Sequence, residues 1–121
     1  MKIIQSPEAH SVIDGVAAGF IHQGQRRDYQ QDAYVLYPNW VAVADGVGGH
    51  EYGELASQYA LQAVVDVLAP QDATDRYTFS KETLQQAYRE AQEATGPDKY
   101  PSRVNTWRPP GTTLMVAARA K

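Results

Sequence analysis

Two short apolar stretches, separated by only two residues, constrain the fold of this chain more than any other feature of its sequence. Residues 33–37 (AYVLY) and 40–44 (WVAVA) are rich in aromatic and β-branched residues, which favour strands. Pro38-Asn39 between them suits a tight turn, so the pattern predicts an antiparallel hairpin. The second stretch runs directly into Asp45-Gly46, and the sequence therefore predicts a carboxylate at the end of an apolar strand.

Two helices are predicted after this hairpin. Apolar residues recur at helical spacing over residues 51–69, and Pro70 is expected to stop that helix. Ser80 can cap a second helix over residues 81–95, which is followed by the stop signal Gly96-Pro97.

Further strands are predicted at residues 15–22 and 112–118, which are short and apolar. Strands grouped apart from helices favour an α+β class over alternating β-α-β units. No repeat or internal linker divides the chain, so residues 1–121 are interpreted as one domain. The last stretch is strongly apolar, and a strand of this kind is expected to have partners on both sides.

The overall composition excludes several functional classes. The net charge of -3 and the pI near 5.5 argue against a nucleic-acid binder, which would normally carry a basic face. The absence of cysteine excludes disulfides, thiolate zinc sites and a cysteine nucleophile. No stretch approaches the roughly 20 apolar residues that span a bilayer, and the N-terminus lacks a signal-peptide pattern. We therefore expect a cytoplasmic protein with neither nucleic-acid nor membrane partners.

A small group of polar residues could carry chemistry. Asp45 and the backbone carbonyl of Gly46 are oxygen ligands of the kind that Mg²⁺ or Mn²⁺ prefers, although a simple Asp-Gly turn is the alternative. Upstream, Arg27 could clamp a phosphate through its planar guanidinium, with Asp32 close behind it, and the alternative there is a solvated loop. His50 could be a ligand, a proton donor or a helix-entry residue, of which we favour the last. The glycine-rich run that ends at His50 lacks the Gly-Lys-Ser/Thr ending of a nucleotide phosphate loop.

Four ordered motifs give the sequence a family resemblance. They are G-x-x-R-x-x-Q-Q-D-A at 24–33, W-V-A-V-A-D-G-V-G-G-H at 40–50, G-E-x-A-S at 53–57 and G-T-T-L at 111–114. Together they resemble the metal-dependent serine/threonine protein phosphatases of the PPM, or type 2C, family, and most of all its bacterial members. The resemblance covers about residues 16–118.

The resemblance implies a fold and a site. The fold would be a β-sandwich flanked by helices, and the site would hold two Mn²⁺ or Mg²⁺ ions that activate a water for attack on phosphoserine or phosphothreonine. By position, Asp45 would bridge the two ions, the Gly46 carbonyl would bind one of them, and Asp32 would belong to the metal site. Arg27 would hold the phosphate of a phosphorylated protein substrate.

The sequence departs from the family pattern at three points. Gln31 stands where many members have glutamate, and Val47 stands where some eukaryotic members have a histidine that can act as a general acid. The later family motifs, a Gly-Asp-Ser-Arg-like segment and two further aspartates, would lie after Lys121. We therefore expect a truncated, partial phosphatase domain that is weak or inactive alone and that self-associates or lacks its C-terminal half. The alternative is a non-catalytic module that binds a phosphoprotein or another partner.

Overall fold

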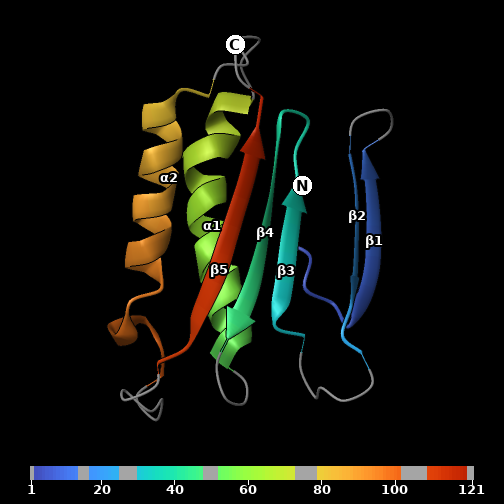
Figure 1. The fold of residues 1–121 in the computed structure, drawn as a ribbon, viewed down its shortest axis with the longest axis vertical. Helices are drawn as coiled ribbons and strands as arrows, with labels where there is room; N and C mark the ends of the chain where they lie inside the picture. Colours follow the sequence, from blue (N-terminus) through green and yellow to red (C-terminus); the bar gives the residue numbers. More distant parts are fainter. Residues whose placement is uncertain are drawn as a thin grey trace.

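The computed structural model describes residues 2–13, 17–24, 30–47, 52–72, 79–101 and 109–119 (Figure 1). The elements within them, in chain order, are β1 (Glu8–Ile13), β2 (Ala17–His22), β3 (Asp32–Leu36), β4 (Trp40–Val47), α1 (Tyr52–Asp72), α2 (Lys81–Ala94), the 3₁₀ turn η1 (Pro97–Lys99) and β5 (Gly111–Ala118).

The strands form two antiparallel sheets beside a pair of helices. In the larger sheet β4 lies between β3 and β5, and β1 and β2 form a separate two-stranded sheet. Figure 1 shows the two helices together on one side of the larger sheet and the β1–β2 hairpin beside β3. This arrangement confirms the predicted α+β class and corresponds to part of a helix-flanked β-sandwich.

The larger sheet has a buried face and an open face. In β4, Trp40, Ala42 and Ala44 are buried toward the helices, whereas Val43 and Asp45 are exposed on the opposite side, here called the open face. The core lies between the sheet and the helices. Its larger members are Val35, Trp40, Leu61, Val64, Leu68 and Phe79.

The predicted hairpin is confirmed, but its second strand is longer than expected. The Tyr37 N–H donates to the Trp40 carbonyl at 2.9 Å and closes the turn. β4 then continues to Val47, so the interpretation of Asp45 and Gly46 as a simple turn is wrong. The weak strand preference of these two residues is overridden because β4 is paired on both sides, by β3 and by β5.

Both predicted helices are present, and one of them passes its expected end. Ser80 caps α2 by accepting a hydrogen bond from the Thr83 N–H at 3.2 Å, as predicted. α1 was expected to end before Pro70 but continues to Asp72. The proline deprives the Asp66 carbonyl of its helical donor, yet Asp66 is exposed to water and the buried Leu68 holds this last turn on the core. Neither helix of the described residues is long and apolar enough to cross a bilayer.

The first strand is not apparent in the sequence. None of the six residues of β1 is fully buried, so the apolar alternation that reveals most strands is weak. The strand exists through its pairing with β2, which begins at Ala17 within the predicted stretch; residues 15–16 of that prediction lie outside the described residues. The hairpin is held to β3 by Tyr34, whose hydroxyl lies 2.9 Å from Ser11 Oγ.

The last strand, β5, confirms the prediction for residues 112–118, and its outer edge has an unexpected partner. Among the described residues its only strand neighbour is β4. On the other edge, the Tyr88 hydroxyl of α2 accepts a hydrogen bond from the Val116 N–H at 3.2 Å and donates to the Leu114 carbonyl at 3.4 Å. A helix side chain therefore replaces part of the second strand that the apolar sequence led us to expect.

Tyr100 gives the fold a testable dependence on alkaline pH. Its hydroxyl donates to the Thr95 carbonyl at 3.1 Å, and its ring stacks on Tyr59 at 5.7 Å. Burial, with a smaller contribution from Tyr59, raises the pKa of Tyr100 above its ordinary value. Because the folded pKa exceeds the unfolded pKa of about 10, this stabilisation is complete below about pH 10 and is lost as the pH rises through the folded pKa.

We therefore expect Tyr100→Phe to lower the free energy of unfolding by about 1 kcal/mol at neutral pH, through loss of the hydrogen bond. Above about pH 10 the stability of the wild-type chain should fall more steeply than that of the variant. Urea titrations at neutral and alkaline pH measure both. Parallel pH profiles for the two proteins would contradict the assignment to Tyr100.

Candidate metal centre

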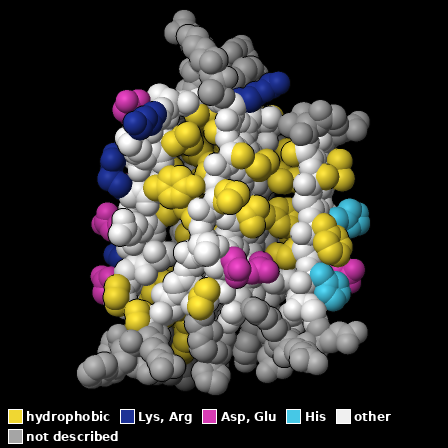
Figure 2. All heavy atoms as spheres, viewed as in Figure 1, with side chains coloured by type: hydrophobic (Ala, Val, Ile, Leu, Met, Phe, Trp, Pro, Cys, Tyr) yellow, Lys and Arg dark blue, Asp and Glu magenta, His cyan; other side chains and the backbone are white. Residues whose placement is uncertain are grey.

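Two aspartates lie opposite one another on β3 and β4. Asp32 and Asp45 are register partners on these antiparallel strands. Asp45 is exposed next to the buried Ala44, and register partners on antiparallel strands share a face, so the half-buried Asp32 lies on the open face as well. Residues directly opposite in such a pair have Cβ atoms roughly 4.5–5.5 Å apart. Figure 2 shows acidic side chains side by side on this face, and we call Asp32 and Asp45 the acid pair.

The third strand restrains the backbone of this pair. Thr113 of β5 lies opposite Asp45, and its Oγ1 accepts a hydrogen bond from the Asp45 N–H at 3.2 Å. Asp45 is thus held between β3 and β5 while its side chain is exposed. A carboxylate on a restrained backbone can bind a cation without first ordering the chain.

Gly46 lies where three parts of the chain converge. Its N–H donates to the Gln31 carbonyl at 3.1 Å. A Cβ at this position would lie 2.0 Å from the Gly53 carbonyl oxygen and 2.7 Å from the Gln31 carbonyl oxygen. These distances are far inside van der Waals contact, so only glycine fits between the approach to β3 and the first turn of α1. The glycine after Asp45 therefore has a packing reason that the sequence does not reveal.

A buried serine of α1 holds the approach to β3 in place through hydrogen bonds. Ser57 is fully buried, and its hydroxyl donates to the Gln31 carbonyl at 2.7 Å. The Gln5 amide donates to the Ser57 hydroxyl at 2.8 Å and to the Glu54 carbonyl at 3.0 Å. The motif at 53–57 includes this serine but indicates no role for it. The available signal was a hydroxyl within the apolar stripe of the predicted helix.

The structure brings together three of the predicted site residues. Asp32, Asp45 and Gly46 lie at one end of the sheet, and Gln31 adjoins them through its carbonyl. Arg27 and His50 lie outside the described residues, as do the two glycines before His50. No group of three or more acidic, histidine or cysteine side chains suited to a metal occurs in the described ranges. The two carboxylates fit part of an Mg²⁺ or Mn²⁺ shell, because both ions prefer oxygen ligands.

Comparison with known proteins relates this arrangement to one family and two solved structures. A family described as protein phosphatase 2C matches residues 19–121. The PPM Ser-Thr phosphatase MsPP from Mycobacterium smegmatis, determined in complex with cacodylate, is similar in fold with a TM-score of 0.62 and 23% identity. That match covers 92% of this chain and 38% of MsPP.

The second structure is the Mycobacterium tuberculosis serine/threonine phosphatase PstP/Ppp, with a TM-score of 0.54 and 29% identity. It covers 80% of this chain and 39% of that phosphatase. The chain thus spans less than half the length of either structure. No curated protein sequence matches the chain significantly.

Proposed function

The chain belongs to the protein phosphatase 2C family, and on that premise we propose that it carries the N-terminal half of a metal-dependent phosphatase site. The substrate would be a protein bearing phosphoserine or phosphothreonine. Residues 1–121 would form a single partial domain of that enzyme. The cytoplasmic location expected from the sequence stays a prediction.

The acid pair is the observation that carries this proposal. Asp32 and Asp45 are paired in register on the open face, and Asp45 is exposed to an incoming cation. We propose that both hold Mn²⁺ or Mg²⁺, with the Gly46 carbonyl as a further oxygen ligand. The hydrogen bond from Gly46 to Gln31 and the bond from Ser57 to the same carbonyl would keep this backbone in place.

The chemistry divides between the ions and the chain. When bound, the ions would supply a water of lowered pKa and would neutralise the charge that develops on the phosphate. Asp32 and Asp45 would anchor and orient that centre. Arg27 would bind two oxygens of the phosphate through its guanidinium and align the ester for attack.

Two carboxylates and one carbonyl can anchor one such ion, which keeps several waters, but they are few protein ligands for the two ions of the proposed site. We propose that the remaining ligands come from a C-terminal half or from a second copy of the chain. The isolated chain would then bind metal weakly and hydrolyse phosphate esters slowly. This partial coverage agrees with the share of the related phosphatases that the chain spans.

A non-catalytic module is the second proposal, and the open face favours it. Val43 and Met115 are 53% and 72% exposed on the same face as the acid pair. Apolar side chains beside a polar site are typical of surfaces that bind proteins. Such a module would bind a phosphoprotein through Arg27 and the exposed sheet without cleaving the ester.

Mn²⁺ titration of the ¹⁵N-labelled chain tests the proposed metal site without requiring activity. Paramagnetic broadening should be strongest at residues 32, 45 and 46 in the wild type. Asp45→Asn should weaken Mn²⁺ binding by at least about 10-fold, because it removes the charge of a direct ligand. Asp98→Asn, which changes an exposed aspartate of η1, is the matched control and should leave the broadening unchanged.

Broadening centred on the helices, or equal in wild type and Asp45→Asn, would rule out the acid pair as the metal site. Hydrolysis of a small aryl phosphate then separates the two functions. Mn²⁺-dependent turnover that is lost in Asp45→Asn and in EDTA would indicate a completed site, for example by self-association. Binding of a phosphopeptide without turnover would favour the module.

A further inference from the structure

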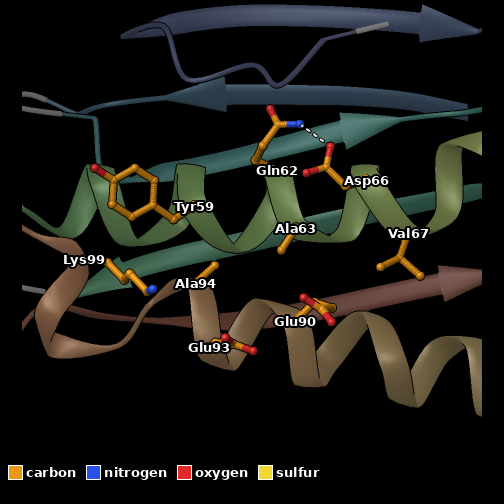
Figure 3. Close-up of a pocket in the computed structure, with 9 residues that line it drawn as sticks. All are labelled: Tyr59, Gln62, Ala63, Asp66, Val67, Glu90, Glu93, Ala94 and Lys99. Atoms are coloured by element: carbon orange, nitrogen blue, oxygen red, sulfur yellow. Dashed lines mark hydrogen bonds between the residues drawn. The ribbon is translucent and has the colours of Figure 1, made fainter.

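A groove of about 520 Å³ lies between α1 and α2, on the helical side of the molecule and therefore apart from the acid pair. Figure 3 shows Ala63 and Val67 of α1 and Ala94 of α2 between the two helices, along the floor of this hollow. The two alanines are too small to fill the space between the helix backbones, so an apolar strip is left accessible. We call this feature the helix groove.

Both helices that border the helix groove carry carboxylates along it. Asp66 projects from α1 on one side, and Glu90 and Glu93 project from α2 on the other (Figure 3). All three are exposed. Lys99 is the one cation among the described residues that line the groove. Its Nζ lies 3.8 Å from Oδ2 of Asp98, a residue that does not line the groove, so this cation already has an acidic partner. Arg89 borders a different hollow, on another side of α2.

This distribution of charge specifies the occupant. Exposed carboxylates on both sides of one strip make it negatively charged, and a ligand with positive charge on both flanks complements that charge. The apolar strip between the two rows of carboxylates favours a ligand with apolar side chains along its centre. An anionic segment would be repelled by these carboxylates. An uncharged segment would displace water from them without providing a positive partner.

We propose that the helix groove binds a basic amphipathic helix of another protein. Its leucine-like side chains would pack on Ala63, Val67 and Ala94, and its lysines or arginines would reach Asp66, Glu90 and Glu93. A third helix laid between two packed helices is a common mode of peptide recognition. The site is independent of the proposed metal centre, which lies on the other side of the sheet.

Fluorescence anisotropy tests the proposal with the full chain and a labelled synthetic peptide that has leucine at i, i+3, i+4 and i+7 spacing and lysine at the positions between. Binding should be saturable, should weaken with rising ionic strength, and should be absent for the same peptide with glutamate in place of lysine. ¹H–¹⁵N shift changes should map to residues 59–67 and 90–94.

Glu90→Lys should weaken binding by about 10-fold, since it replaces an attraction by a repulsion. Glu82→Lys is the matched control, because it makes the same charge change on α2 at an exposed position outside the groove, and it should leave the affinity within about 2-fold. Ala63→Leu should also weaken binding by filling the floor without changing charge, and circular dichroism would establish that each variant is folded.

Equal effects of Glu90→Lys and Glu82→Lys would overturn the proposal and indicate nonspecific charge attraction. Shift changes confined to the open face would overturn it as well. Self-association that Ala63→Leu abolishes, without peptide binding by the wild type, would identify the occupant as a second copy of this chain and would equally refute a basic helix.

Discussion

Replacement of Gly46 by alanine is expected to lower the free energy of unfolding by about 3 kcal/mol, a large share of the stability of a small domain. The new Cβ would lie 2.0 Å from the Gly53 carbonyl oxygen and 2.7 Å from the Gln31 carbonyl oxygen. Both are backbone atoms, which cannot rotate away as a side chain can. β4 would therefore have to move away from the first turn of α1, and urea unfolding followed by circular dichroism measures the loss.

Gly111→Ala is the matched control for this substitution. Gly111 begins β5 opposite the end of β4, and no heavy atom lies within 4 Å of a Cβ built there. The change should alter the free energy of unfolding by no more than about 0.5 kcal/mol. Similar losses in the two variants would show that glycine at position 46 is not required by the convergence of β4, α1 and the approach to β3.

Truncation of Leu61 to alanine is expected to cost about 3 kcal/mol of unfolding free energy. Leu61 is fully buried in the core between the sheet and the helices. The substitution loses the transfer free energy of the removed methyl and methylene groups. It also leaves a cavity, because the surrounding structure relaxes only in part. The same urea titration, with an unchanged m-value, provides the measurement.

Met115→Ala is the corresponding change on the other side of the sheet. Met115 is 72% exposed on the open face, so its truncation should cost less than about 1 kcal/mol. A loss as large as that of Leu61→Ala would mean that the open face is covered in solution. Sedimentation of the same samples would then show whether a second copy of the chain provides the cover.

Local patterns were sufficient for most of the fold. A tight-turn pair between two β-rich stretches predicted the β3–β4 hairpin, and the cap at Ser80 predicted the start of α2. Each of these signals lies within a few adjacent residues, so the chemistry of the side chains and the backbone preference are sufficient to reveal it. The order of the motifs indicated the family before any contact was known, and the family match over residues 19–121 confirmed it.

Features made by distant residues required the tertiary structure. The position of Asp32 opposite Asp45 depends on strand register, and the need for glycine at position 46 depends on how closely α1 approaches. The extension of β4 to Val47 and the cover of β5 by Tyr88 have the same origin.

These features share one physical cause: the environment of each residue is made by residues that are distant in the sequence. Local preference for turn, strand or helix amounts to a few tenths of a kcal/mol per residue, up to about 1 kcal/mol. Ladder pairing, the backbone hydrogen bond of Gly46 and the hydrogen bond of the buried Ser57 hydroxyl outweigh it. The sequence therefore specified the elements and the candidate ligands, and long-range packing decided which of them meet.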